Sequence, residues 1–365
     1  MTDHNARVWI EINRAALIHN IIQLKKVLNT LHVAAVIKCN AYGHGLISVG
    51  RICDDQPEVY MLCVAFLSEA LQLRKSGVTK HILVMCYIDD DLAKAVNEDI
   101  AFMVDTYEEI YAMNAVGAQH SYRFSIHIKV DTGLSRRGIS SEEVYRFIIT
   151  SQQLPYVHVV GLCSHFACAY LAESLQTTVQ QRLFSTIIQS LAMTGNLPPL
   201  VHISNSSLIS VEGCSMVRVG LALYGYNASS YSLDLRPVLR LKSIVHAIRT
   251  VPENRSIGYD ALCITTRVTR VGLIPIGYAD GYDMRFSNCC VVELHNQQVP
   301  VLGRVGMNCI AVDLTEISDV HVGIEVTLIG DTPGVRMSDL LHAAGMRNVR
   351  EPLTRLNPLI PRYVV

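Results

Sequence analysis

A lysine follows a short apolar run near the start of the chain, and its position points to chemistry. The run from His32 to Ile37 fits a strand that is buried on both faces. Lys38 then stands at the carboxyl end of that strand, where parallel sheets carry their ligand sites. An ammonium group there is partly desolvated, which makes a neutral, nucleophilic amine accessible near neutral pH. Such an amine can hold a carbonyl cofactor as a Schiff base.

The residues after this lysine favour an anionic ligand. Gly43 and Gly45 allow the backbone to approach an anion closely, as a phosphate-bearing cofactor requires. A lysine at a strand end is more often a solvated end-group, so the lysine alone does not decide its role. The run AVIKCNAYGHG, residues 35–45, resembles VVKANAYGHG, the motif that binds pyridoxal 5'-phosphate in alanine racemases. The resemblance implies that Lys38 carries this cofactor and that Tyr42 helps to bind it.

A second charged run ends the predicted strand 123–130. Residues 129–138, KVDTGLSRRG, resemble the racemase run KxDTGMxRxG. In that family the arginine, here Arg136, contacts the cofactor's phenolic oxygen and the substrate carboxylate, a task that suits its fixed charge and planar fork. Lys129 matches a family lysine that can be carbamylated to steady this arginine. Without the resemblance, two arginines in a solvated loop would be the simpler interpretation.

The next two predicted strands end in a histidine and in serines. The run CSHFA is similar to the family's THFA, which implies that His165 lies beside the pyridine ring. Residues 202–206, HISNS, are similar to HxxNS, in which the serine binds phosphate, so Asn205 and Ser206 are predicted to contact the cofactor. We expect Ser206 and Ser207 to open a helix. The free N–H groups and the dipole at the start of that helix would favour an anion.

The eighth predicted strand carries an arginine. Residues 216–225, MVRVGLALYG, resemble the family's MVRPGIxLYG, with Val219 in place of proline. This implies that Arg218 bonds to the pyridine nitrogen and that Gly220 and Leu221 give backbone N–H groups to the phosphate. An arginine stays protonated and leaves the ring nitrogen unprotonated, which weakens the ring as an electron sink. A weaker sink keeps the carbanion short-lived, which fits racemisation better than transamination.

Racemisation needs a proton-transferring group on each face of the α-carbon. Lys38 serves one face, and Tyr259, in RSIGYD, aligns with the family's tyrosine for the other. The run PIGYADG, residues 275–281, is identical to a family motif in which the tyrosine, here Tyr278, lines the substrate entrance. GRVGMN resembles GRVCMDQ, in which the backbone N–H of the methionine, here Met307, receives the substrate carboxylate.

The family also implies an assembly. In alanine racemases the β domain of one subunit completes the barrel site of the other. Tyr259, Tyr278 and Met307 are therefore expected to act in trans, so that a homodimer with shared active sites is the smallest active unit. The family's product, D-alanine, supplies peptidoglycan.

The match has departures that leave other functions open. Asn308 replaces an aspartate, Gly306 replaces a cysteine, and residues 356–362 lack a tyrosine found near the phosphate in many alanine racemases. Relatives that racemise serine are similar in changing this last region, so serine or a broad set of amino acids is an alternative substrate. A second alternative is a non-catalytic carrier of the cofactor, but such carriers lack the domain with Tyr259. A third is a related decarboxylase, but these enzymes generally have an acid at the ring nitrogen, where this chain has Arg218.

These residues need a scaffold of alternating strands and helices. Strand-like runs alternate with helical patterns such as 68–76 and 178–194, which predicts a (β/α)₈ barrel, with a doubly wound sheet as the competing fold. Short strand-like runs from Arg236 onward predict a mainly β domain. We therefore expect a barrel over 8–230 and a β domain over 231–365, with the first strand, 8–12, packing on the second domain. The barrel strands are predicted at 32–38, 61–66, 81–87, 100–105, 123–130, 157–164, 200–204 and 215–219.

Composition limits the class of protein. With 365 residues the chain is long enough for two domains, and a net charge of −1 gives no footprint for nucleic acid or an anionic membrane. The 11 cysteines are dispersed and form no C-x-x-C pair, so we read them as reduced thiols and assign no metal site. No leader and no spanning segment is recognisable, which favours a soluble cytoplasmic enzyme. The high apolar content is also compatible with a domain of a longer, membrane-anchored protein.

Overall fold

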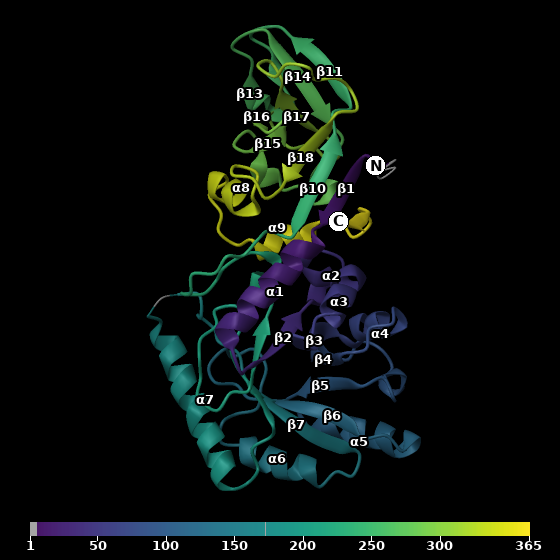
Figure 1. Ribbon diagram of the computed structural model, residues 1–365, viewed down its shortest axis with the longest axis vertical. Coiled ribbons are helices and arrows are strands. Elements are labelled where there is room, and N and C mark those ends of the chain that lie inside the picture. The colour runs from purple at the N-terminus through teal and green to yellow at the C-terminus, as the bar shows by residue number, and fades with distance from the viewer. Residues whose placement is uncertain (1–5, 172) are drawn as a thin grey trace. The chain divides into compact units, whose positions relative to one another are not determined.

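The computed structural model describes residues 6–171 and 173–365, which form two compact units (Figure 1). We call the first the barrel unit and the second the sheet unit. The barrel unit consists of Leu17–Ala41 and Leu46–Leu235, and the sheet unit consists of the chain up to Ala16, Tyr42–Gly45 and Arg236–Val365.

Eight parallel strands form the centre of the barrel unit, in the order β8-β7-β6-β5-β4-β3-β2-β9. The first and last strands of this order also meet, because the Ser215 N–H donates to the Val201 carbonyl at 2.9 Å and the Arg218 N–H donates to the Ser204 carbonyl at 3.1 Å. The predicted barrel is thus confirmed, and the doubly wound sheet is wrong. The strands are β2 (His32–Val36), β3 (Val59–Phe66), β4 (His81–Tyr87), β5 (Ile100–Val104), β6 (Phe124–Lys129), β7 (Val157–Cys163), β8 (Leu200–His202) and β9 (Met216–Val219).

Burial of the strands explains their apolar runs. Every residue of β5 is buried, as expected for a parallel strand covered on both faces. Phe102 of β5 and Phe124 of β6 meet edge to face with ring centroids 6.1 Å apart. On the first helix, Leu17, Ile21 and Leu24 are fully buried at helical spacing, so one stripe of this helix faces the core.

Helices follow most of the barrel strands, but not all. The connection from β4 to β5 contains only a short 3₁₀ helix, η1 (Leu92–Ala95), and none is present between β8 and β9. The barrel-unit helices are α1 (Arg14–Leu28), α3 (Leu46–Asp54), α4 (Leu67–Lys75), α5 (Tyr107–His120), α6 (Val144–Gln152) and α7 (Leu175–Met193), with the short η2 (Leu221–Tyr224) after β9 and the five-residue α2 (Lys38–Tyr42) after β2.

The expectation that Ser206 and Ser207 open a helix is wrong. The Asn205 side-chain oxygen accepts the Ser207 N–H at 2.9 Å, and the Asn205 carbonyl accepts the Leu208 N–H at 2.9 Å. Leu208 then takes a left-handed φ of 56°. The asparagine side chain thus forms a tight turn with its own backbone, which competes with helix formation.

The sheet unit is built on a nine-stranded sheet in the order β11-β14-β17-β16-β15-β18-β10-β1-β19. The first strand of the chain, β1, pairs with β10 in antiparallel and with β19 in parallel orientation. Alternate residues of β10 are buried, so one of its faces supplies the core. The strands are β1 (Val8–Ile12), β10 (Leu239–Ile244), β11 (Ala247–Val251), β14 (Thr269–Ile274), β15 (Val291–Leu294), β16 (Gln297–Leu302), β17 (Ile310–Asp313), β18 (Glu325–Ile329) and β19 (Arg362–Val364).

Smaller elements complete the sheet unit. A separate hairpin pairs β12 (Ser256–Ile257) with β13 (Cys263–Ile264). Two short helices, α8 and α9, accompany the strands of the β domain that the sequence predicts. Pro352 lies in the first turn of α9, where proline is tolerated. The helices are α8 (Met337–Ala343) and α9 (Arg350–Arg355), with 3₁₀ turns η3 (Tyr259–Ala261), η4 (Tyr278–Asp280) and η5 (Met284–Phe286).

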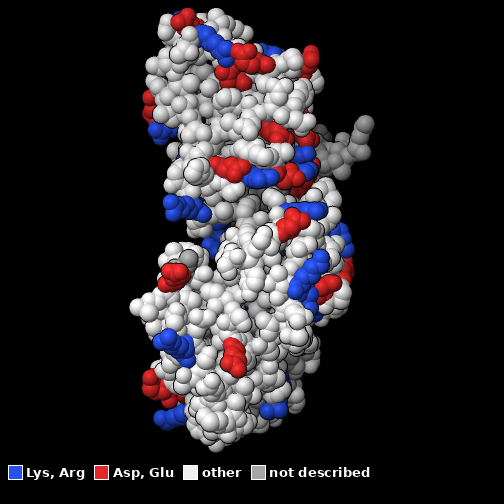
Figure 2. Space-filling model, turned by 60° about the vertical axis from the view of Figure 1, so that its left-hand side comes forward, with Lys and Arg blue, Asp and Glu red and all other residues white. Residues whose placement is uncertain are grey.

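Two properties of the surface bear on partners. On the face drawn in Figure 2, basic and acidic side chains are interspersed and separated by uncharged stretches, in keeping with the balanced composition. Within residues 6–171 and 173–365, each helix is too short or too polar to cross a bilayer.

Candidate active site

Lys38 lies just beyond β2 and is half-buried. The four residues after it all take a left-handed conformation, with φ between 52° and 56°, although none is a glycine. Left-handed backbone costs roughly 1–2 kcal/mol per non-glycine residue, so the surrounding structure must hold this turn in place. The turn consists of Cys39, Asn40, Ala41 and Tyr42.

Two side chains hold the turn. The Glu69 carboxylate accepts the Cys39 N–H at 2.7 Å, while its other oxygen accepts the Ala65 N–H at 2.8 Å. The Asn40 side-chain oxygen accepts the Leu46 N–H, at the start of α3, at 2.8 Å. The strained turn is thereby fixed to the end of β3 and to α3, which sets the position of the lysine before it.

The sequence linked Gly43 to the binding of an anion, but the structure gives another reason for a glycine at this position. Its φ is +85°, and a Cβ at this position would lie 2.0 Å from the Leu353 carbonyl oxygen of α9. The Arg362 Nε–H donates to the Gly43 carbonyl at 2.9 Å. Glycine is therefore required here because the backbone packs directly against α9.

Arg218 of β9 lies at the centre of a buried polar cluster. Its side chain is only 4 % exposed. One terminal nitrogen donates to His202 Nδ1, and the other donates to the Ser164 carbonyl at 2.8 Å and to His165 Nδ1 at 3.1 Å. The Nε–H group is not among these donors. Arg218 is thus fixed in orientation while one guanidinium donor remains for a ligand.

The same cluster fixes the tautomers of two histidines. A guanidinium can only donate, so His202 Nδ1 must accept and His202 Nε2 must carry the proton. His202 Nε2 lies 2.8 Å from His127 Nδ1, which must then accept. Burial, with the charge of Arg218, lowers the pKa of His127 to about 3 and that of His202 well below its usual value, so both rings are neutral. Gly161 leaves room for this pair, because a Cβ there would lie 2.0 Å from His127 Nδ1.

His165, which follows β7, lies among positively charged side chains. Burial and, to a smaller extent, four cationic side chains together lower its pKa to about 3. A site with so much positive charge and a neutral histidine favours anions such as a phosphate and a carboxylate. In order of effect, the four cations are Arg218, Arg136, Lys129 and Lys38.

Of the other two cations, Lys129 is buried and Arg136 is exposed. Burial lowers the pKa of Lys129, and the Arg136 charge lowers it too, while Cys163 and Asp105 act in the opposite direction. Lys129 is the last residue of β6, and Arg136 lies in the loop 130–139 that follows.

Three serines follow β8, and one of them contacts the backbone expected to bind phosphate. The Ser206 hydroxyl accepts the N–H groups of Gly220 and Ala222 at 3.1 and 3.3 Å. The Ser204 and Ser207 hydroxyls are buried and have no hydrogen-bond partner among the described residues. Buried hydroxyls normally have a partner, so this cluster fits a polar group that binds there.

In the sheet unit, Tyr259 stands on the turn of the β12–β13 hairpin and is 68 % exposed. The next residue, Asp260, forms an ion pair of 2.8 Å with Arg304. Gly303, with φ +69°, brings the neighbouring loop so close that a Cβ would lie 2.4 Å from the Ile257 carbonyl oxygen. The loop 303–307 therefore supports the hairpin.

Tyr278 and Met307 lie on turns that hydrogen-bond to each other. The Tyr278 N–H donates to the Gly306 carbonyl at 3.0 Å, and the Ala279 N–H donates to the Met307 carbonyl at 3.1 Å. At Gly277 a Cβ would lie 2.2 Å from the Gly306 oxygen, so glycine is needed for this approach. Together with the hairpin contacts, these bonds link the segments of Tyr259, Tyr278 and Met307 within the sheet unit.

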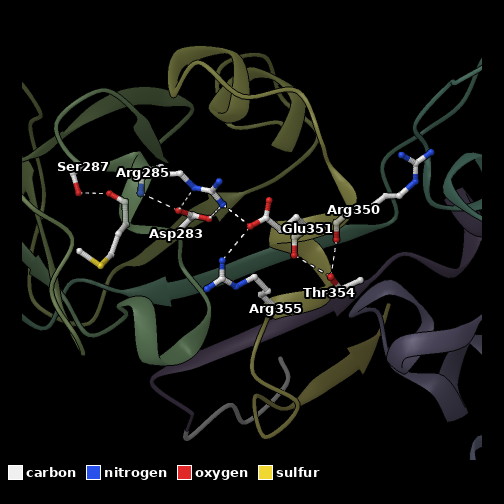
Figure 3. Close-up of polar contacts among 8 residues, drawn as sticks. Asp283, Arg285, Ser287, Arg350, Glu351, Thr354 and Arg355 are labelled. Carbon is white, nitrogen blue, oxygen red and sulfur yellow. Dashed lines mark hydrogen bonds and ion pairs between the residues drawn. The ribbon is translucent and has the colours of Figure 1, made fainter. Parts of the chain in front are cut away.

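A polar cluster supports the loop of Met307 from the other side. The Ser287 hydroxyl accepts the Val305 N–H at 3.0 Å. Ser287 follows Arg285, whose guanidinium binds Asp283 at 2.6 Å and Glu351 of α9 at 2.9 Å (Figure 3). Glu351 also binds Arg355 at 3.2 Å. The loop is thus connected to α9.

The stretch without the family's tyrosine is held by Asn357. Its side-chain N–H donates to the Ala279 carbonyl at 3.2 Å, and its side-chain oxygen accepts the Leu359 N–H at 2.9 Å. The Asn357 backbone N–H donates to the Asp280 carbonyl at 3.0 Å. The amide therefore joins this stretch to the turn of Tyr278.

The structure adds residues to those that sequence identified. His202 begins the run HISNS, and its place at a strand end was the available signal for a role beside Arg218. His127 and Glu69 had no such signal, because their partners come from distant segments. The cations, the directed Arg218 and the unpartnered serines fit pyridoxal phosphate, which has an acidic phosphate, a phenolic oxygen and a basic ring nitrogen.

Comparison with known proteins agrees with this geometry. Residues 12–228 match the family model described as "Alanine racemase, N-terminal domain", and residues 238–364 match "Alanine racemase, C-terminal domain". An alanine racemase from Methanococcus maripaludis is 35 % identical over 88 % of this chain and 89 % of its own. An alanine racemase 2 from Caldanaerobacter subterraneus subsp. tengcongensis is 33 % identical over 100 % of this chain and 96 % of its own. The crystal structure of alanine racemase from Streptomyces lavendulae superposes with a TM-score of 0.92 at 28 % identity, covering 100 % of this chain and 98 % of that one.

Proposed function

The chain belongs to the alanine racemase family of pyridoxal-phosphate-dependent isomerases, and we propose that it interconverts L-alanine and D-alanine with Lys38 and Tyr259 as the two bases. When bound, the cofactor supplies the ring that stabilises negative charge on the substrate α-carbon. The observation that carries the proposal is the orientation of Arg218, whose terminal nitrogens are held by His202, His165 and Ser164.

Arg218 has a donor suited to the ring nitrogen. Because its terminal nitrogens bind protein acceptors, the Nε–H is the group that would donate to the pyridine nitrogen. His202 and His127 are neutral, so neither can offer the ring nitrogen a positively charged donor in place of Arg218. Arg218 would thus leave the ring nitrogen of a bound cofactor unprotonated, because a guanidinium does not give up its proton.

The other barrel residues divide between phosphate and substrate. Ser206, Asn205, Tyr42 and the N–H groups of Gly220 and Leu221 would bind the phosphate. The Gly220 N–H, which donates to the Ser206 hydroxyl in this structure, would exchange that bond for one to the phosphate. The buried, unpartnered hydroxyls beside Ser206 support this part of the proposal. His165 would lie beside the pyridine ring.

Arg136 would bind the substrate carboxylate and the phenolic oxygen of the cofactor. Its exposure and its charge beside the neutral His165 support this role. Carbamylation of Lys129 would steady it, and the lowered pKa of the buried amine favours the neutral form that carbamylation requires. The modified group would exchange a positive for a negative charge beside the arginine.

The exposed residues of the sheet unit support a homodimer with shared sites. Tyr259, Tyr278 and Met307 are 68, 41 and 55 % exposed, and Leu262 and Ile264 of the same hairpin are 45 and 57 % exposed. Large apolar side chains gathered on one hairpin favour cover by another protein surface. A second copy of this chain would place Tyr259 at the partner's barrel, with Tyr278 lining the entrance and the Met307 N–H binding the carboxylate.

Serine is the second candidate substrate, because residues 356–362 lack the family's tyrosine. Asn357 uses its amide to hold the turn of Tyr278. These bonds direct the amide toward the protein's own backbone, and alanine, the substrate named by the matched family models, is the preferred proposal. The ratio of kcat/KM for L-alanine and L-serine tests the preference.

In the cell, the proposed role is cytoplasmic supply of D-alanine for peptidoglycan. A carrier without catalysis is disfavoured by the matched C-terminal domain, and a decarboxylase is disfavoured by Arg218. Carbon dioxide release with no change of chirality would favour the decarboxylase.

The purified chain with pyridoxal phosphate and L-alanine tests the function by chiral separation. Lys38→Ala should lose both turnover and the absorbance band of the lysine-bound cofactor. Tyr259→Phe should keep that band and lose about 10²–10⁴-fold in kcat, the usual contribution of one proton-transfer group. An unchanged band and unchanged turnover in Lys38→Ala would refute the assignment.

A further inference from the structure

Arg136 and Arg137 are adjacent, but only the second is held by the protein. Arg136 is exposed and makes no hydrogen bond or ion pair within the described part of the chain. The Arg137 side chain is only 15 % exposed, and its Nε lies 2.7 Å from the Asp105 carboxylate. It also forms an ion pair with Glu109. The interpretation of both arginines as solvated is therefore wrong for Arg137.

The loop that carries these residues is closed at its base. Val130 and Ile139 form a parallel bridge, and the Ile139 N–H donates to the Lys129 carbonyl at 2.9 Å. Asp131 Oδ1 accepts the N–H groups that follow it in the turn. At Gly138, with φ +135°, a Cβ would lie 2.4 Å from the Asp131 nitrogen. The loop 130–139 is thus compact. Arg137 lies two residues before Ile139, where the loop closes.

Arg137 attaches this loop to three other elements of the barrel unit. Its guanidinium donates to the Cys86 carbonyl in β4 and lies 5.5 Å from the centre of the Tyr87 ring. Asp105 follows β5, and Glu109 lies in the first turn of α5. Several donors in one planar fork thereby bind acceptors whose positions are set by separate elements.

The two carboxylates are themselves fixed. Glu109 forms a capping box with Thr106, and its Oε2 accepts the Asp105 N–H at 2.9 Å. The Asp105 side chain is 5 % exposed. Loss of Arg137 would leave an unpaired carboxylate in a nearly buried position, which the loop and the ends of β4 and β5 would have to rearrange to solvate.

We propose that Arg137 is a positioning residue that anchors the loop 130–139 and so holds Arg136 where it meets the substrate carboxylate. This inference rests on the proposed role of Arg136. The family run KxDTGMxRxG fixes no residue type directly after its arginine, so the anchor is a feature of this chain's own sequence. The residue acts through Arg136 and has no contact with reacting atoms.

Substrate affinity tests the inference in the full-length, cofactor-loaded enzyme. Arg137→Leu, which keeps an apolar stem and removes the charge, should raise the KM for L-alanine about tenfold and change kcat less than threefold, because carboxylate binding is lost without loss of either base. Inhibition by propionate, a carboxylate without an amine, should weaken by the same factor. The absorbance of the lysine-bound cofactor should not change.

Three further single variants and one double variant separate positioning from general stability. Arg267→Leu is the matched control, because Arg267 also pairs with a carboxylate, on Glu316, but at an exposed site of the sheet unit. It should leave KM and propionate inhibition unchanged. Asp105→Asn should imitate Arg137→Leu, and the double variant should show little additional loss because the two residues form one interaction. Arg137→Lys, which keeps the charge, should recover part of the affinity, and it serves with Asp105→Asn if Arg137→Leu does not fold.

Arg136→Leu distinguishes the two levels of the proposal. If it raises KM and weakens propionate inhibition while Arg137→Leu, Arg137→Lys and Asp105→Asn match the Arg267→Leu control, the anchoring role is refuted and the proposed function stands. If Arg136→Leu itself leaves both quantities unchanged, the carboxylate role of Arg136 fails, and the anchoring role fails with it.

Discussion

At the scale of single residues, direction of hydrogen bonding decides what the barrel side chains can do. Arg218 can only donate, and this sets the tautomers of His202 and His127 in turn. Both rings are neutral, so Arg218 carries the positive charge of this group of three side chains. The ring nitrogen of a bound cofactor would therefore meet a guanidinium that cannot lose its proton.

The buried histidines should make the fold sensitive to acid. Burial lowers the pKa of His127 and of His165 to about 3 from an ordinary value of 6.5, so the unfolded chain binds more protons between these values. The free energy of unfolding is therefore unaffected by protonation of these two histidines above pH 6.5. Below it, each histidine lowers the free energy of unfolding by about 1.4 kcal/mol per pH unit down to pH 3.

Urea unfolding of the wild type and of His127→Asn at a series of acidic pH values measures this effect. Asparagine keeps an oxygen that can accept from His202 but does not titrate. The difference in free energy of unfolding between the two proteins should change in favour of the variant by about 1.4 kcal/mol for each pH unit below about 6.5. A difference that is constant with pH would show that His127 is not buried in its neutral form.

At the scale of elements, the sequence indicated strand ends better than it indicated what lies between them. Lys38 and Arg218 follow apolar runs, and buried parallel strands are recognisable from composition alone. The left-handed turn after Lys38 was not predictable, because it opposes the preference of Cys39, Ala41 and Tyr42 and depends on Glu69, 30 positions from Cys39. The turn at Asn205 was missed because one side chain overrode a serine pair that could open a helix.

The site followed the same division. Residues that carry their own motif, such as Tyr259 and Tyr278, could be predicted from the sequence, and their roles stay predictions. Those that act through another side chain, such as His202 and Arg137, became evident only when the fold brought their partners together. Recognition of a family helped with the first kind and not with Arg137, whose position the family run leaves variable.

The hairpin that bears Tyr259 depends on one glycine in the supporting loop. Gly303→Ala would place a Cβ 2.4 Å from the Ile257 carbonyl oxygen, so the hairpin or the loop must shift. We expect a fall in kcat of about 100-fold, the effect of misplacing a catalytic group by an ångström, with the cofactor band unchanged. Steady-state rates and the absorption spectrum measure the two quantities.

Gly345→Ala is the matched control for this change. Its φ of +70° is nearly that of Gly303 at +69°, but nothing lies within 4 Å of the added Cβ. It should cost stability through backbone strain, about 1 kcal/mol, and leave kcat unchanged. Equal kcat values for the two variants would mean that the close approach of the loop does not position Tyr259.

At the scale of the whole molecule, the two proposed bases belong to different compact units. Lys38 lies in the barrel unit and Tyr259 in the sheet unit, and the tyrosine is largely exposed. Because we propose that Tyr259 acts in trans, activity requires a dimer in which each active site takes its lysine from one chain and its tyrosine from the other. Sedimentation of the cofactor-loaded protein should show a species of two chains, and full activity in a monomer would contradict this requirement.

Complementation between two inactive variants measures whether one active site combines residues from both chains. When Lys38→Ala and Tyr259→Phe chains are coexpressed, a mixed dimer has one site with both defects and one site with both bases intact. If the chains pair at random, turnover of L-alanine should recover to about one quarter of the wild-type value per site, while each variant expressed alone stays inactive. Formation of mixed dimers, checked by two affinity tags, with no recovered activity would contradict the account, because no site would then combine a lysine from one chain with a tyrosine from its partner.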